Sequence, residues 1–286
     1  DNISFNTTVM VNERKSEQLL AAIPFTLGSV FGNNVTISPD NIYNPFGTTV
    51  TRAQYRNTKI FRTFSQDVDT YYFGAGFNGS FDLWDRSFAW DVNGIYSDNE
   101  QLDVTLGQFN RNQLALGLGP SFIAADGTPT CGTAAAPIAG CVPINLFQGP
   151  DGFTQEMVDF ASVNLKDQTQ KELYNYTANI TGDIFELPAG PLGFAAGYEY
   201  REYSGSYQPD ALTVAGEYNG VPSLPTSGEY DVSEFYGELN APIYESESGA
   251  SKLDLSLAGR YSDYDFGESS KDETTGKFGL RWQLNE

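Results

Sequence analysis

At 286 residues, with 14% aromatic residues, 29 Gly and 14 Pro, the chain is long enough for one large domain, and its composition favours short β segments over long helices. A net charge of −21 argues against a nucleic-acid partner. The absence of His removes the usual general base near neutral pH and the commonest transition-metal ligand, so histidine-dependent catalysis is excluded.

Apolar and polar residues alternate at period two from the start of the chain, which is the pattern of strands with one apolar face. Transmembrane strands hide their apolar residues in this way, and a membrane-spanning helix is excluded because no run of about 18 apolar residues occurs. The first strand is expected around Ile3, Phe5, Val9 and Val11. A first hairpin, turning near Trp84, has its apolar residues at Tyr71, Phe73, Ala75, Phe77 and Phe81, then at Phe88, Trp90, Val92 and Tyr96.

Two more hairpins and a final strand follow with the same alternation. The second hairpin turns near Pro188, between Tyr174, Tyr176, Ala178, Ile180 and Ile184 and Leu192, Phe194, Ala196, Tyr198 and Tyr200. The third turns near Ser248, between Phe235, Leu239, Ala241 and Ile243 and Leu253, Leu255, Leu257 and Tyr261. The last strand contains Phe278, Leu280, Trp282 and Leu284. In total we expect about eight strands, with aromatic residues clustered near their ends.

The connections between these strands fall into two length classes. Three are short and lie near Trp84, Pro188 and Ser248, whereas three are long and span about 14–62, 98–168 and 204–228. Short turns at one rim and long external loops at the other are typical of outer-membrane barrels, and a soluble sandwich has no reason to sort its loops. The sequence therefore predicts an all-β fold: the wall of an antiparallel, up-and-down transmembrane β-barrel whose apolar faces point outward.

Cys131 and Cys141 lie close together in a stretch rich in Gly, Ala and Pro, within the second long loop. The chain offers no His or further Cys that could complete a zinc site with them. We therefore expect a disulfide on the long-loop side, formed in an oxidising compartment and with little effect on the barrel.

Several phrases of the sequence resemble the barrel domain of TonB-dependent receptors. They are NIYNPFG at 41–47, FSQDVDTYYFGAGFNGSF at 64–81, CVPINLFQGPDGFTQEMVDF at 141–160, LPAGPLGFAAGYEYREYSGSYQPD at 187–210, EYDVSEFYGELNAPI at 229–243, LDLSLAGRYSDYDFG at 253–267 and TTGKFGLRWQ at 274–283. Within the third phrase, TQEM looks like the start of a short helix. The resemblance implies an importer in a Gram-negative outer membrane, in contact with membrane lipid and lipopolysaccharide. Its scarce ligand would be a siderophore, a cobalamin-like cofactor or an oligosaccharide.

Receptors of this kind resemble a 22-stranded barrel closed by an N-terminal plug. No phrase here resembles the plug or the segment that engages TonB. We therefore expect residues 1–286 to form part of the barrel wall, with TonB, the plug and the remaining strands as missing partners. The strands near Ile3 and Leu280 should pair with chain beyond this sequence, because open edges inside a membrane are costly. The alternative is a soluble extracellular β protein that binds glycans or assembles with its own copies through exposed edges.

Charged side chains mark the face opposite the apolar residues. They are Glu199, Arg201, Glu234, Glu238, Asp254, Arg260 and Arg281. This lumen-facing charge ladder has two interpretations: contact with a ligand or the plug, or pairing of opposite charges between neighbouring strands. No P-loop, nucleophile elbow or EF-hand loop occurs, so we expect no enzyme, no cofactor and no metal site.

Overall fold

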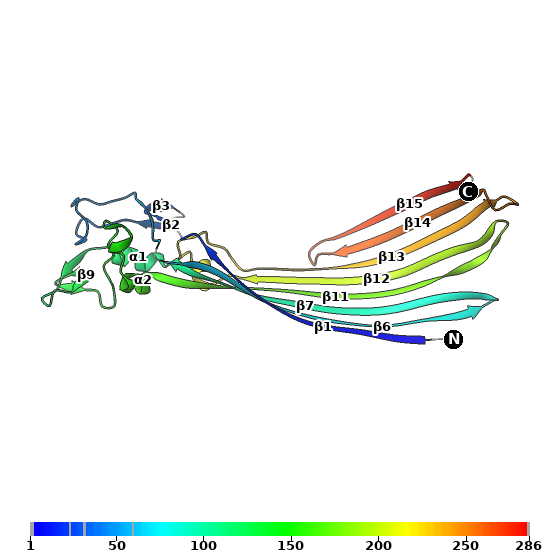
Figure 1. Cartoon of the computed structure of the whole chain (residues 1–286), viewed down its shortest axis with the longest axis horizontal. Helices are drawn as coiled ribbons and strands as arrows, with labels where there is room; N and C mark the ends of the chain where they lie inside the picture. Colours follow the sequence, from blue (N-terminus) through cyan, green and yellow to red (C-terminus); the bar gives the residue numbers. More distant parts are fainter. Residues whose placement is uncertain (1–2, 23, 31–32, 59, 285–286) are drawn as a thin grey trace.

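The computed structural model of the chain describes residues 3–22, 24–30, 33–58 and 60–284. Its main feature is a sheet of eight antiparallel strands, each paired with the next long strand in the chain, and we call this sheet the wall (Figure 1). The strands are β1 (Ile3–Leu20), β6 (Arg62–Leu83), β7 (Arg86–Phe109), β11 (Ser162–Leu187), β12 (Gly190–Gln208), β13 (Thr226–Glu245), β14 (Lys252–Asp265) and β15 (Ser270–Gln283). The eight strands and their up-and-down order confirm the prediction from the sequence.

Three short turns join wall strands at one end of the sheet, where both chain ends also lie (Figure 1). The turn between β6 and β7 holds Trp84 and Asp85, whose φ angles of 51° and 59° lie in the left-handed region. Two such residues in a row form the hairpin turn whose twist matches that of the flanking strands. The turns β11–β12 and β13–β14 contain Pro188 and Ser248. All three turns lie where the sequence predicts them.

At the opposite end, three long connections fold into a unit that we call the loop lobe (Figure 1). They join β1 to β6, β7 to β11 and β12 to β13. Their short strands are β2 (Pro24–Thr26), β3 (Gly28–Val30), β4 (Asn33–Val35), β5 (Gln54–Arg56), β8 (Ser121–Ile123), β9 (Pro129–Thr133) and β10 (Ala136–Pro137). Their helices are α1 (Arg111–Gly117), α2 (Gln155–Ala161) and α3 (Ala211–Ala215), with a 3-10 turn at Gly149–Gly152. No helix in the described part of the chain is long and apolar enough to cross a membrane.

The hydrophobic core of the protein lies in the loop lobe. It comprises Leu27, Ile37, Ile60, Phe109, Leu114, Leu118, Ile144, Phe153, Met157 and Ala161. Helix α2 contributes Met157 and begins where the TQEM phrase predicts a helix, with the Thr154 side chain accepting a hydrogen bond from the backbone N–H of Met157 at 3.3 Å. The Cys131–Cys141 disulfide lies in the same unit and confirms the predicted bond. The lobe therefore joins segments that are far apart in the sequence.

The wall strands extend further toward the loop lobe than the sequence predicts. The expected loops begin near residues 14, 98 and 204, whereas β1 continues to Leu20, β7 to Phe109 and β12 to Gln208. Beyond the alternating segments β1 and β12 carry mostly polar side chains on both faces, and β7 passes through five polar residues at 97–101 before apolar residues return at Leu102 and Val104, so the period-two signal is interrupted. The backbone ladder persists because hydrogen bonds between strands do not depend on side-chain polarity. In the structure the connections span 21–61, 110–161 and 209–225.

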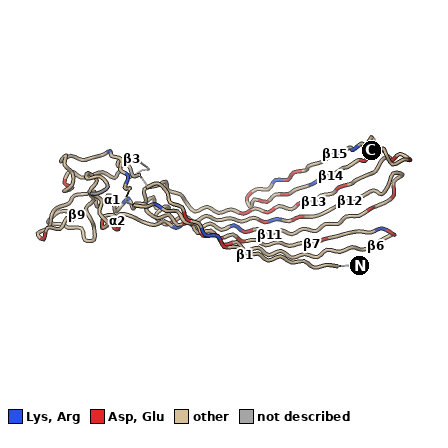
Figure 2. Tube along the Cα trace, in the orientation of Figure 1, with Lys and Arg blue, Asp and Glu red and all other residues tan. Residues whose placement is uncertain are grey.

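One face of the wall, which we call the apolar band, presents apolar side chains along every strand. The pairing register aligns in one row Phe5, Phe77, Val92, Ala178, Tyr198, Phe235, Tyr261 and Thr274. The other apolar residues predicted for these strands share this face as far as the register is regular. The register shifts near Ile184 on β11 and near Ile243 on β13. Nothing in the described part of the chain covers the band, since Phe5 is 59% exposed. On β1 the charged residues begin only at Glu13, where the strand approaches the lobe (Figure 2).

The wall is an open sheet. Strands β1 and β15 stand at its two edges, and each has a single strand neighbour within the described ranges. The strand at 3–12 and the strand at 277–284 therefore do not seal an eight-stranded barrel. Each edge presents a row of backbone N–H and C=O groups that another strand could pair with.

Candidate functional site

The face of the wall opposite the apolar band, which we call the polar face, carries the predicted charge ladder. The register places all seven predicted residues on this face. Directly opposite one another are Glu199 and Glu234 on β12 and β13, and Asp254 and Arg281 on β14 and β15. The strands thus bring the predicted charges onto one surface.

Glu234 is the centre of this ladder and is only 4% exposed. The Nη2 of Arg201 donates to Glu234 Oε2 at 2.8 Å, and the Nη1 of Arg260 donates to the same oxygen at 3.5 Å. The Ser262 hydroxyl donates to Glu234 Oε1 at 2.6 Å. The Nε of Arg201 also lies 3.5 Å from Oε1 of Glu199. Two cations and a hydroxyl therefore compensate a buried carboxylate that would be costly alone.

A chain of polar contacts extends the ladder toward β7. The Arg260 guanidinium lies 5.6 Å from the centre of the Tyr236 ring, and the Tyr236 hydroxyl donates to Asn179 Oδ1 at 2.8 Å. Asn179 Nδ2 donates to Asp91 Oδ2 at 2.8 Å, and Asn93 Nδ2 donates to the same oxygen at 2.7 Å. The predicted ladder does not include these partners, of which only Asp91 is charged. Their position opposite the apolar band is the signal that could have found them.

The other three predicted residues lie outside this network. Asp254 and Arg281 are opposite in the register, yet no ion pair joins them among the contacts of the described residues. Glu238 lines a groove of about 530 Å³ on the polar face, together with Arg260 and Lys277. The ladder is therefore one paired cluster with a polar groove beside it.

One group of acidic side chains in the described ranges could hold a metal ion, and it lies on the face of the apolar band. The carboxylates of Glu13, Asp67 and Asp69 approach within 4.8 Å of one another. The Nζ of Lys15 already lies 2.7 Å from Glu13 Oε1 and 2.9 Å from Asp67 Oδ2. A fixed ammonium thus already neutralises part of this group.

The connection between β12 and β13 fastens the loop lobe to the end of the wall. The backbone N–H of Phe109 donates to Asn219 Oδ1 at 2.7 Å, and the N–H of Asn219 donates to the Phe109 carbonyl at 3.1 Å. The N–H of Arg111 donates to the Glu217 carbonyl at 2.8 Å, and its Nη1 donates to the Gly216 carbonyl at 3.2 Å. Burial lowers the pKa of the Arg111 guanidinium. These contacts therefore join the third connection to the end of β7 and to the start of the second connection.

Two loop tips of the lobe present phenylalanines through the same local structure. The N–H of Phe46 donates to Asn44 Oδ1, and the N–H of Phe147 donates to Asn145 Oδ1, both at 3.0 Å. Each Asn side chain fixes the turn that holds its Phe. Phe46 is 65% exposed, and the two rings meet edge to face with centres 5.8 Å apart. The pair offers an apolar contact point on the lobe.

Comparison with known proteins gives one match. A family model described as TonB dependent receptor-like, beta-barrel, matches residues 22–286. The matched range begins just after β1 and includes the other seven wall strands and the whole loop lobe. Neither a curated protein nor a solved structure matches the chain.

Proposed function

Because the chain belongs to the TonB-dependent receptor-like β-barrel family, a family of outer-membrane transporters, we propose that it forms wall strands of an active importer in a Gram-negative outer membrane. The observation that carries this proposal is the apolar band, which crosses all eight strands from Phe5 on β1 to Phe278 on β15. Such a band suits hydrocarbon, and the opposite face suits a water-filled lumen. The family match and the uncovered band both disfavour a soluble glycan-binding protein.

The open edges support a larger barrel. In hydrocarbon each unpaired backbone group costs several kcal/mol, and closed barrels avoid this cost. In our proposal β1 and β15 pair with further strands of a barrel of the 22-stranded type. A plug then fills the lumen, and TonB supplies the energy for import, as the family implies. The charge ladder around Glu234 faces that plug.

The loop lobe is the proposed capture element for the ligand. Its position at the long-loop rim and the exposed pair Phe46 and Phe147 support this role. A siderophore, a cobalamin-like cofactor and an oligosaccharide are the candidate ligands. An exposed aromatic pair suits each of these three, since all present apolar or ring surfaces.

Labelling of single cysteines in the intact receptor in native membranes tests the orientation. The two native cysteines are bonded to each other, so an added cysteine is the only free thiol of the described residues. We expect Phe235→Cys, in the band, to react with a lipid-soluble maleimide and not with a charged, impermeant one. Phe46→Cys, on the lobe, serves as the matched control and should react with the impermeant reagent from outside. Reaction of Phe235→Cys with the impermeant reagent alone would contradict the proposal.

A further inference from the structure

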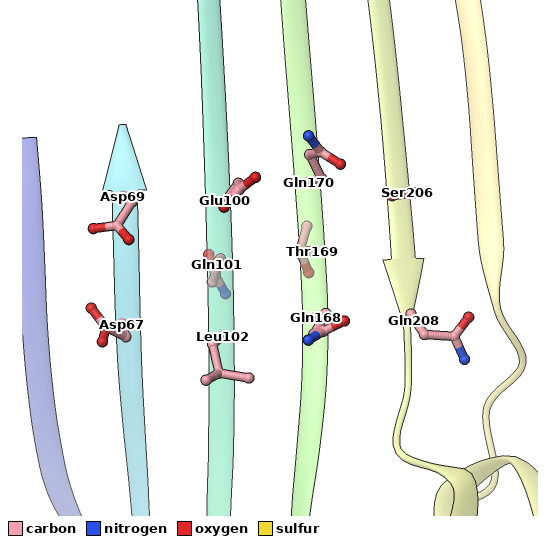
Figure 3. A pocket seen from close by; sticks show the side chains of 10 residues that line it. All are labelled: Asp67, Asp69, Glu100, Gln101, Leu102, Gln168, Thr169, Gln170, Ser206 and Gln208. Atoms are coloured by element: carbon pink, nitrogen blue, oxygen red, sulfur yellow. The ribbon is translucent and has the colours of Figure 1, made fainter. Parts of the chain in front are cut away.

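The face of the apolar band continues past its last tyrosines into a polar groove. Going toward the loop lobe, the last tyrosines of the band are Tyr71 on β6, Tyr96 on β7, Tyr174 on β11 and Tyr200 on β12, and beyond them this face is mainly polar, with Leu102 and Val104 of β7 among the exceptions. Beyond them lies a groove of about 390 Å³, which we call the rim groove (Figure 3). Its lining is mostly polar and includes Asp67, Asp69, Glu100, Gln168, Ser206 and Gln208.

The pairing register shows which side chains point into the rim groove. One row contains Asp69, Glu100, Gln170 and Ser206, and the next contains Asp67, Leu102, Gln168 and Gln208. Both rows share the face of Tyr71, because each lies an even number of residues along its strand from the band. Gln101 and Thr169 fall between the rows, so their side chains point to the polar face. The rim groove is therefore on the outward surface, directly beyond the band.

The side chains of the rim groove favour a ligand that carries hydroxyl groups over a ligand that carries a negative charge. Among the described residues, the side chains of Asp69, Glu100 and Gln168 make no hydrogen bond, and the covered Oδ1 of Asp67 has no partner. Carboxylates accept hydrogen bonds, and amides both donate and accept them, which matches the hydroxyls of a sugar. The nearby cation Lys15 is already held by Asp67. Three carboxylates would repel a phosphate or another anion.

The position of the rim groove indicates which kind of molecule could present hydroxyl groups to it. Tyrosines at the edge of an apolar band lie at the level of lipid headgroups. Two of them point polar ends toward the groove side: Tyr96 donates to Glu172 and Tyr200 donates to Glu202, each at 3.2 Å. A strand rises about 3.3 Å per residue, so Asp69 lies about 7 Å beyond Tyr71. That distance places the groove beside the headgroup of a membrane lipid and not in the lumen.

From these observations we propose that the rim groove binds the uncharged sugar headgroup of an outer-leaflet glycolipid. The inference rests on the proposed function, since it requires that the apolar band faces lipid. The lipid's chains lie along the band, and its sugar hydroxyls bond to Asp69, Glu100 and Gln168. This contact is separate from ligand capture by the loop lobe, and it fixes the height of the barrel in the membrane.

The test uses native mass spectrometry of the intact receptor released from phosphatidylcholine vesicles that contain either a neutral digalactosyl lipid or anionic phosphatidylglycerol. We expect the wild type to retain the digalactosyl lipid in preference to phosphatidylglycerol. The double variant Gln168→Ala/Ser206→Ala should retain it about 10-fold less, because it loses two neutral hydrogen-bonding groups. Thr181→Ala is the matched control on the same strand, outside the rim groove and with its side chain on the polar face, and should behave as the wild type.

Three results would overturn the proposal: equal retention by the double variant, a preference for phosphatidylglycerol, or equally tight binding of free digalactose at the groove. The last would indicate a site for soluble sugar. The cysteine labelling of Phe235→Cys separates this failure from that of the proposed function. If the lipid-soluble reagent labels the band while no glycolipid is retained, only the rim-groove proposal is wrong.

Discussion

The loop lobe and the wall are stabilised in opposite ways. The lobe has a buried core around Phe109 and Phe153, a disulfide and capped helices. The wall has a continuous backbone ladder, but many of its large apolar residues, such as Phe5 and Phe278, are exposed. The core of this protein is thus built by its loops. The lobe carries the apolar burial that stabilises it, whereas the wall depends on lipid and on neighbouring strands.

Truncating a core residue of the lobe should produce the largest effect. Phe153 is buried against Tyr55 and Phe109, with ring centres 6.0 and 6.1 Å apart. We expect Phe153→Ala to destabilise the lobe by about 3–5 kcal/mol through the cavity it leaves. The matched change Phe77→Ala in the band should cost less than about 1 kcal/mol in detergent. Proteolysis of the intact receptor across a urea series measures the stability of both variants. Similar losses of stability for Phe153→Ala and Phe77→Ala would contradict the contrast between the lobe and the wall.

Removing the disulfide should affect the lobe alone. The bond closes a short loop in the second connection, so Cys131→Ser/Cys141→Ser should lower the stability of the lobe by about 2–3 kcal/mol. The β-sheet signal of the wall in circular dichroism should melt unchanged. If the wall melts earlier in this variant, the two regions form one cooperative unit and the comparison is wrong.

Within the wall, we expect substitution of Glu234 to cause the largest loss of stability. Its removal leaves Arg201 and Arg260 facing each other without their shared carboxylate. We expect Glu234→Ala to cost about 2 kcal/mol, less than a fully buried pair because both arginines are partly exposed. Lys15→Ala breaks a solvent-exposed pair, which water and salt screen, and should therefore lower stability much less than Glu234→Ala does. Urea unfolding of the receptor in detergent measures the stability of both variants. A larger loss of stability for Lys15→Ala than for Glu234→Ala would show that Glu234 is not the main electrostatic contact of the wall.

The smallest effect is expected at the exposed aromatic pair of the lobe. Phe46→Ala removes an edge-to-face contact with Phe147 but almost no burial. We expect a loss of about 0.5–1 kcal/mol. The same proteolysis assay should therefore separate this variant clearly from Phe153→Ala. A loss as large as that of Phe153→Ala would mean that the lobe packs against something at this tip.

The wall could be predicted from the sequence because its signal is local. Each strand alternates at period two, and each turn is marked by residues such as Pro188 within a few positions. The same period-two alternation places the seven charged residues of the ladder on one face. The extensions to Leu20 and Phe109 escaped it, because the polar runs at 13–18 and 97–101 interrupt the period-two pattern.

The lobe core and the burial of Glu234 could not be predicted in this way. Leu27, Ile144 and Phe153 belong to connections with no periodicity, and only the fold brings them together. The burial of Glu234 depends on Arg201 and Ser262, which lie on the two neighbouring strands. Alternation assigns a face to a side chain but does not assign its partners.

The second connection also sets the order in which the chain can fold. Strands β7 and β11 pair directly although residues 110–161 separate them. Closing a loop of about 50 residues costs about 3–4 kcal/mol of chain entropy, whereas the hairpins β6–β7 and β11–β12 close over a few residues. The backbone hydrogen bond from Asn110 to Ala161, 2.8 Å long, joins the two ends of that loop at the lobe core. We therefore expect the hairpins to form early and to dock only when the lobe collapses, so that the external loops direct assembly of the sheet.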